Sequence, residues 1–132
     1  IITCSHVIQD SHSFDILIKH CQGSPQYKAT VIYRNSGSLH SPYDIAVIKC
    51  PEATAGIHYE VPKISIPKLG EKVYVVGHAL FNIELDLQPS LCAGVISKVI
   101  SFNSQPVMLQ STCAVHPGAS GGPLLNSQGQ LE

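Results

Sequence analysis

A serine flanked by glycines, Ser120, is the residue best suited to act as a nucleophile. It stands in the run His116–Pro123, which reads His-Pro-Gly-Ala-Ser-Gly-Gly-Pro. Glycine lets the backbone bend so that the hydroxyl stands free, while the amides of Gly118 and Ser120 can point into one small space. Such donors suit a developing oxyanion, each contributing roughly 3–4 kcal/mol. The same composition is also typical of ordinary turns between strands, so the motif alone leaves both interpretations open.

His6 and Asp44 offer the two further groups that a catalytic serine requires. A serine hydroxyl is a feeble nucleophile at neutral pH, so it needs a base within hydrogen-bond reach and a third group that holds the base in one tautomer. His6 ends the run Thr-Cys-Ser-His, and Asp44 precedes the apolar stretch 45–48. An acid at that point is ordinarily a turn former. The three residues lie far apart in the chain, so only the fold can bring them together.

Length and composition describe a globular domain. The chain has 132 residues, of which 44% are hydrophobic and 13% charged, enough for one domain with a real core. No run approaches the roughly 18–20 apolar residues of a membrane span, and no basic stretch precedes an apolar core as in a secretory signal. The net charge is −1 and the basic residues are scattered. We therefore expect neither a membrane nor a nucleic acid as partner.

Five cysteines are spread through the chain, at positions 4, 21, 50, 92 and 113. They form no CxxC pair and leave one unmatched, which favours reduced thiols in a reducing intracellular compartment over a disulfide framework. Cys4 and His6 are potential metal ligands, but the sequence shows no second ligand pair nearby. We expect no metal and no cofactor.

The apolar pattern predicts an all-β protein. Val, Ile and Tyr cluster in short runs separated by Gly, Pro, Asn and Ser, and no segment holds a helical period. Strands are expected at 1–4, 14–19, 27–33, 45–48, 72–78, 91–100, 107–112 and from 124, a helical turn at 5–8, loops at 35–43 and 81–90, and a type I turn at 126–129. The strands at 14–19 and 27–33 form a hairpin. Gly94 predicts a bulge or bend in its strand.

Residues 51–70 are the best linker candidate, because they carry five Pro and Gly residues with little sustained period. The strand-rich blocks on either side would suit two similar β units packed together. We expect an N-terminal unit at 1–66, with the candidate His and Asp, and a C-terminal unit at 67–132, with the candidate Ser.

The three motifs together resemble those of the trypsin-like serine proteases. Thr3–His6 is similar to the family's Thr-Ala-Ala-His, Asp44–Lys49 to its Asp-Ile-Ala-Leu strand, and Gly118–Pro123 to its Gly-Asp-Ser-Gly-Gly-Pro. The order His, Asp, Ser is that of chymotrypsin. Three matches in this order are far more specific than one, and they extend over essentially the whole chain. The resemblance implies a chymotrypsin-like double β-barrel.

The resemblance also implies a role for each site residue. Ser120 would be the nucleophile, His6 the general base and then acid, and Asp44 the group that orients His6. The amides of Gly118 and Ser120 would form the oxyanion hole. The reaction would pass through an acyl-enzyme and need no cofactor.

Ala114, with its neighbour Val115, stands where the resemblance places the specificity pocket. Members that cleave after Lys or Arg carry an acidic residue there, and an apolar residue gives an incoming cation no partner for its lost hydration. We expect a small or apolar side chain before the scissile bond. Ala119 replaces the Asp that pairs with a newly cut N-terminus in zymogen-activated members, so that ion pair is not available.

Within the family the chain resembles the HtrA/Deg branch, because no Cys follows His6 and a non-acidic residue precedes Ser120. The segment Gln110–Pro117 ahead of the serine motif is similar to that of peroxisomal processing proteases. This resemblance implies a serine endopeptidase in the peroxisome that acts on protein or peptide substrates, imported precursor enzymes among them, by leader removal or internal cleavage. It leaves homo-oligomerisation and self-cleavage open.

The ends of the chain keep an alternative open. The double barrel needs strands before its His and after its Ser, so we expect both barrels to be truncated, and Leu131–Glu132 could be a cloning remnant. An inactive or incomplete protease-fold module that acts by binding is the main alternative, and it would apply if His6 and Ser120 lie too far apart to bond. A viral or bacterial chymotrypsin-like enzyme of other specificity is a second alternative.

Overall fold

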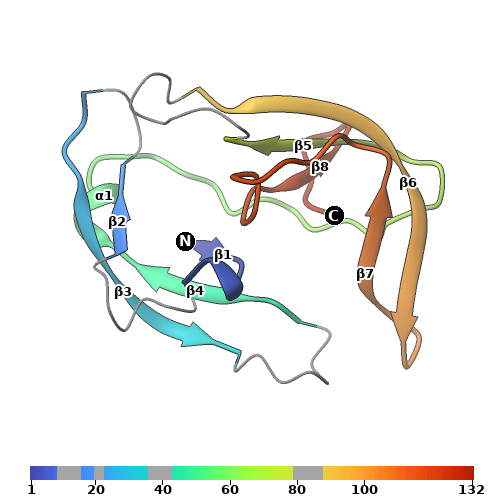
Figure 1. Ribbon diagram of the computed structural model, residues 1–132, viewed down its shortest axis with the longest axis horizontal. Coiled ribbons are helices and arrows are strands. Elements are labelled where there is room, and N and C mark those ends of the chain that lie inside the picture. The colour runs from blue at the N-terminus through green and yellow to red at the C-terminus, as the bar shows by residue number, and fades with distance from the viewer. Residues whose placement is uncertain (9–15, 20–22, 36–42, 79–87) are drawn as a thin grey trace. The chain divides into compact units, whose positions relative to one another are not determined.

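The computed structural model describes residues 1–8, 16–19, 23–35, 43–78 and 88–132, in two compact units, Ile1–Tyr59 and Glu60–Glu132 (Figure 1). Each unit contains one four-stranded antiparallel sheet, so the all-β prediction is confirmed. Parts of the loops expected at 35–43 and 81–90, and the start of the strand expected at 14–19, lie outside the described residues. Among the described residues, no helical segment has the length and apolarity of a membrane span.

The sheet of the first unit has the order β1-β4-β3-β2. Its strands are β1 (Ile2–Thr3), β2 (Ile16–Ile18), β3 (Tyr27–Arg34) and β4 (Ala46–Lys49). The predicted hairpin is present as the antiparallel pair β2 and β3. Buried Ala46 and Ile48 point from β4 into a small core that also holds Ile8 of the 3₁₀ helix η1 (His6–Ile8). The core therefore fixes both the start of β4 and the turn that follows β1.

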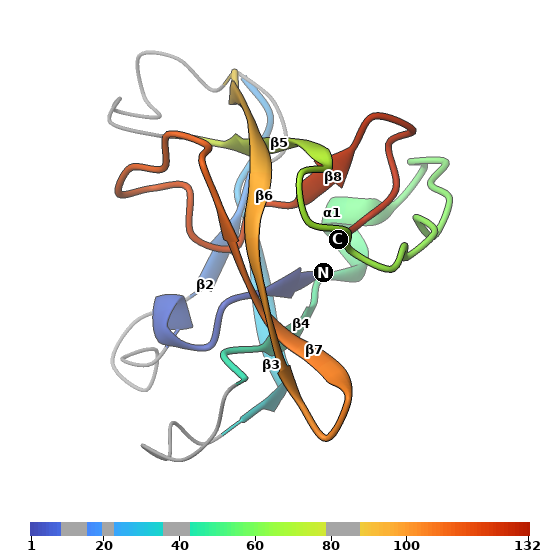
Figure 2. The ribbon, with the colours of Figure 1, turned by 90° about the vertical axis from the view of Figure 1, so that its right-hand side faces the viewer.

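The sheet of the second unit has the order β7-β6-β5-β8. Its strands are β5 (Lys72–Gly77), β6 (Ser90–Phe102), β7 (Gln105–Ser111) and β8 (Leu124–Asn126). Figure 2 shows the long strand β6 with β7 folded back along it. Val73 and Ile96, almost fully buried, form the core together with Cys113. β5 pairs with β8 on its other side, so the chain that returns after β7 is tied to the middle of this sheet.

The structure adds detail to two local expectations: the division between the units falls within the linker candidate at 51–70, and β6, the strand that contains Gly94, is irregular. The segment at 51–70 begins with a short helix, α1 (Pro51–Thr54), because proline suits the first helical turn and the Thr54 hydroxyl donates to the carbonyls of Cys50 and Pro51. Gly94 lies in continuous register with β5, and the irregularities of β6 come after Ile96. The glycine serves close approach, since a Cβ there would lie 2.5 Å from the backbone nitrogen of Cys113.

Candidate active site

His6 and Asp44 lie together in the first unit and are joined by two hydrogen bonds. One carboxylate oxygen, Oδ2, pairs with ring nitrogen Nδ1 of His6. The other, Oδ1, accepts the backbone N–H of His6 at 2.9 Å. The Ser5 N–H donates to the main-chain carbonyl of Asp44 at 3.2 Å. Asp44 therefore fixes both the ring and the backbone of His6.

The charge state of Asp44 follows from these contacts. The side-chain hydrogen bond with His6 lowers the pKa of the Asp44 carboxyl, against an opposing effect of desolvation. The carboxylate is thus ionised at neutral pH and accepts a hydrogen bond from the N–H at Nδ1 of His6. A neutral imidazole with its proton on Nδ1 presents the lone pair of Nε2 outward. The pair has the arrangement that a general base requires.

Asn35 holds the turn that carries Asp44, a role that the sequence did not reveal. Its side-chain oxygen accepts the Ile45 N–H at 2.8 Å, and its side-chain amide donates to the carbonyl of Tyr43. Its backbone N–H donates to the carbonyl of Ile45 at 3.1 Å. The Ser5 hydroxyl donates to the carbonyl of Asn35 at 3.0 Å. Asn35 thus binds the backbone on both sides of Asp44. Ser5, the residue before His6, forms a hydrogen bond with Asn35.

Ser120 lies in a tight turn of the second unit. Ala119 donates its N–H to the carbonyl of His116 at 3.1 Å and accepts the N–H of Gly122 at 3.0 Å. Ala119 is buried, whereas Ser120 is exposed. Gly118 has φ +95°, in the region that favours glycine. Among the described residues, neither the Gly118 amide nor the Ser120 amide has a hydrogen-bond acceptor, so both remain available as donors.

The end of β5 packs against the turn that carries Ser120. The Val76 N–H donates to the carbonyl of Pro123 at 3.2 Å. At Gly122, a Cβ would lie only 2.1 Å from the carbonyl oxygen of Val76, and at Gly77 a Cβ would lie 2.8 Å from Cα of Ala119. Side chains at these two glycines would push the serine turn away from the strand. The two glycines therefore set the position of the Ser120 backbone.

Ala114 and Val115 are exposed residues of the irregular segment between β7 and the serine turn. The neighbouring Cys113 is buried, and its thiol faces the carbonyl of Val73 at 3.7 Å. This contact anchors the segment to β5. No charged side chain stands at either expected pocket position.

The sequence-predicted residues thus fall into two groups. His6 and Asp44 are brought together in the first unit, and Ser120, Gly118 and the segment 114–115 follow one another in the second. All of these candidate residues are exposed.

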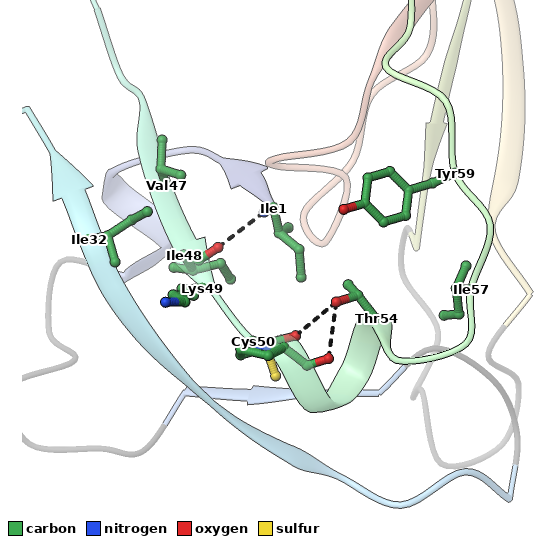
Figure 3. Close-up of a pocket in the computed structure, with 10 residues that line it drawn as sticks. Ile1, Ile32, Val47, Ile48, Lys49, Cys50, Thr54, Ile57 and Tyr59 are labelled. Carbon is green, nitrogen blue, oxygen red and sulfur yellow. Dashed lines mark hydrogen bonds between the residues drawn. The ribbon is translucent and has the colours of Figure 1, made fainter.

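A separate hollow of about 620 Å³ lies in the first unit (Figure 3). Its lining is mostly apolar and includes Ile1, Val47, Ile57 and Tyr59. At its edge the terminal amino group of Ile1 donates to the carbonyl of Ile48 at 3.0 Å. Neither His6 nor Asp44 lines this hollow, so it is distinct from the pair.

Comparisons with known proteins identify the family of the chain. A profile of the trypsin-like peptidase domain matches residues 1–131. The peroxisomal leader peptide-processing protease of Homo sapiens is 36% identical over 132 residues, 99% of this chain and 22% of the relative. The Mus musculus enzyme of that name is 35% identical over 127 residues, 96% of this chain and 22% of the relative. The serine endoprotease DegS of Escherichia coli K12 is 30% identical over 136 residues, 99% of this chain and 34% of the relative.

The chain spans about a fifth of the length of the two peroxisomal relatives. Since the family profile covers almost every residue, and the predicted all-β architecture is present, the match extends well beyond short motifs. The chain belongs to the trypsin-like peptidases.

Proposed function

We propose that this chain carries the catalytic residues of a serine endopeptidase. Ser120 is the nucleophile, His6 the general base and then acid, and Asp44 the orienting carboxylate. The observation that carries the proposal is the double hold of Asp44 on His6, through ring nitrogen and backbone N–H. A carboxylate that only ended a turn would have no need to select the tautomer of a neighbouring imidazole.

The proposed reaction has two halves. Ser120 Oγ attacks the peptide carbonyl carbon while its proton passes to Nε2 of His6, and the amides of Gly118 and Ser120 receive the oxyanion. The imidazolium, stabilised by Asp44, gives the proton to the leaving amine as the C–N bond breaks. Water then attacks the acyl-enzyme, His6 takes its proton, and Ser120 is restored as the acid product leaves.

The His–Asp half corresponds to the unit Ile1–Tyr59 and the Ser half to the unit Glu60–Glu132, so the boundary expected at 66/67 lies a few residues after this division. The serine turn has its own support from the end of β5. The His–Asp pair has its own support from Asn35. In this proposal each unit contributes a preorganised half of the machinery.

Substrate preference follows from the segment 114–115. Ala114 and Val115 bring no negative charge to the proposed pocket, so a Lys or Arg side chain would lose its hydration there without a partner. The proposed enzyme cuts after small or apolar residues. The proposed substrates are imported peroxisomal proteins, cut at a leader or internally, and this rests on the similarity to peroxisomal leader peptide-processing proteases. The proposed location is accordingly the peroxisome.

The direct test is covalent labelling of the full-length protein with a fluorophosphonate, which reports an activated serine. We expect labelling of the wild type and of Ser127→Ala, a matched control in an exposed turn, and its loss in Ser120→Ala and His6→Ala. Circular dichroism shows whether each variant is folded. A folded wild-type protein that takes no label, or a Ser120→Ala variant that keeps it, would refute the proposal and favour a binding module.

Specificity is tested with peptide substrates that differ only in the residue before the cut. We expect kcat/KM for Ala or Val to exceed that for Lys or Arg. Ala114→Asp should shift the preference toward Lys and Arg, because the new carboxylate would pair with the cation. A wild-type preference for Lys or Arg would show that the segment 114–115 does not line the pocket.

A further inference from the structure

A third side chain with metal-binding chemistry lies beside the His–Asp pair. Cys4 follows β1 directly and stands two residues before His6. Its Sγ, a ring nitrogen of His6 and a carboxylate oxygen of Asp44 all lie within 4.8 Å of one another. The sequence showed only the first two as neighbours, and the fold supplies the third donor from 38 residues away. We propose that Cys4, His6 and Asp44 form a zinc site that inhibits the peptidase.

The donor set and its geometry suit zinc. Thiolate, imidazole and carboxylate are the three ligand types that Zn²⁺ uses, at about 2.3, 2.0–2.1 and 2.0–2.2 Å. Tetrahedral angles with these bond lengths place the donor atoms about 3.4–3.6 Å apart. Nδ1 of His6 and Oδ2 of Asp44 are in hydrogen-bond contact, so zinc binding would require these two atoms to move apart, and rotation of the Cys4 side chain would bring Sγ, within 4.8 Å, into range. A thiolate in the set disfavours Mg²⁺ and Ca²⁺, which prefer oxygen ligands.

The contacts of Asp44 leave one of its oxygens for the metal. Oδ1 is held by the His6 backbone N–H, whereas Oδ2 faces the ring. Zn²⁺ would therefore replace the proton between Nδ1 and Oδ2 and release it, with the thiol proton, to solvent. His6 and Asp44 are both about half exposed, at 53% and 48% of their side-chain surface, which leaves an approach for the ion and a fourth position for water.

Cys4 differs from the buried thiols of the chain. Cys50 donates to the carbonyl of Lys28 at 3.3 Å, and Cys113 faces the carbonyl of Val73 at 3.7 Å. The Cys4 thiol has no hydrogen-bond partner within the described parts of the chain, and it is only half-buried. It can turn toward a metal without giving up a hydrogen bond of this kind.

Metal binding would remove the general base whichever ring nitrogen it used. With zinc on Nδ1, the neutral ring must keep its proton on Nε2 and has no lone pair for the serine proton. With zinc on Nε2, the base is blocked directly. This consequence rests on the proposed function of His6, whereas zinc binding itself does not. Release of the ion by a chelator restores the base.

The test uses full-length protein, reduced and freed of metal, and titrates it with Co²⁺ as a spectroscopic substitute for Zn²⁺. We expect a thiolate-to-cobalt charge-transfer band that Zn²⁺ removes. Cys4→Ala should lose that band and weaken zinc affinity at least about tenfold. Cys4 is only half-buried, so the smaller alanine should leave the fold intact. Cys92→Ala is the matched control, since Cys92 is also half-buried but lies on β6, and it should keep the band.

The second readout is fluorophosphonate labelling of Ser120, with each variant compared with its own metal-free rate. Zinc should slow labelling of the wild type and of Cys92→Ala, reversibly with chelator, and Cys4→Ala should need at least about tenfold more zinc. Equal cobalt bands in wild type and Cys4→Ala would overturn the site. A Cys4-dependent band without slower labelling would overturn inhibition. If metal-free protein takes no label, the proposed function fails and the cobalt band alone decides the zinc site.

Discussion

Asn35→Ala should lower catalysis although Asn35 touches neither substrate nor a reacting atom. Its side chain holds the backbone on both sides of Asp44, through the Ile45 N–H at 2.8 Å and the Tyr43 carbonyl. Alanine removes both hydrogen bonds and leaves the turn to water. The perturbation therefore reaches His6 only through the position of the carboxylate, which makes Asn35 a positioning residue.

The magnitude follows from the two hydrogen bonds that alanine cannot make. Each hydrogen bond contributes about 0.5–1.5 kcal/mol net, so the two together contribute about 1–3 kcal/mol to the free energy of unfolding. A displacement of a catalytic group by about 1 Å costs up to about 10²-fold in rate. We expect kcat to fall roughly 10- to 100-fold, with KM almost unchanged, because the substitution removes no group proposed to contact substrate.

The assay compares steady-state kinetics and thermal unfolding for three variants of the full-length protein. Asn35→Asp keeps an acceptor for the Ile45 N–H and loses the donor to Tyr43, so its kcat should lie between wild type and Asn35→Ala. Thr54→Ala is the matched control, since its side chain also contacts two backbone groups of the same unit, the carbonyls of Cys50 and Pro51 at 3.4 and 3.1 Å, away from the pair. A destabilised Asn35→Ala with wild-type kcat, or a Thr54→Ala that loses as much kcat, would refute the reasoning.

Two further predictions concern the serine turn and the carboxylate. Gly122→Ala places a Cβ 2.1 Å from the Val76 carbonyl oxygen, so the turn must shift; we expect a loss of about 1–3 kcal/mol in stability and slower fluorophosphonate labelling, and unchanged values for both would contradict the role of Gly122. Asp44 has a lower pKa in the folded chain than the ordinary 3.8, so its stabilising contribution is present above that value and is lost as the pH falls through the lowered one. An NMR titration of the Asp44 carboxyl carbon should show a midpoint below 3.8, and a midpoint at or above it would contradict the assignment.

The strands that sequence reasoning located best are those rich in β-branched and aromatic residues. β3 and β5 occupy nearly the predicted residues, because their apolar residues are bounded by clear turn signals. The end of β6 was underestimated because Asn103 and Ser104, both with positive φ, make a tight turn that lets the hairpin continue to Phe102. Neither residue is a glycine, so the turn carried no strong signal.

Some residues of the candidate site could be predicted from local sequence, and others only from the fold. Ser120 and its glycines are contiguous, so local composition was enough to predict a bent backbone with an exposed hydroxyl. Asn35 could not be found, because its role depends on the end of β3 lying beside the start of β4, and an Asn after a strand is ordinarily a turn residue. Cys4 and His6 were potential ligands in the sequence, but the third donor of the proposed site, Asp44, is brought to them only by the fold.

In the proposed mechanism, the exposure of the His6–Asp44 pair favours a role for Asp44 through orientation of His6 more than through charge. With about half of each side chain exposed, water screens the attraction, and exposed pairs contribute only about 0–1 kcal/mol. Asp44→Asn removes the charge but also inverts the hydrogen bonding: if its oxygen still accepts the His6 backbone N–H, its NH₂ group faces Nδ1 and drives the ring proton onto Nε2. We therefore expect Asp44→Asn to lose about 10⁴-fold in kcat, as in chymotrypsin.

Salt separates the two contributions, because the screening length falls to about 3 Å at 1 M. Raising the salt from about 0.1 to 1 M strengthens the screening of the His6–Asp44 attraction. If orientation dominates, kcat of the wild type changes little over this range, while kcat of Asp44→Asn stays low throughout. A wild-type kcat that fell with salt toward the Asp44→Asn value would assign the effect to charge instead. The backbone N–H of His6, donating to Oδ1 at 2.9 Å, is what makes the first outcome the expected one, since it fixes which carboxylate oxygen meets the ring.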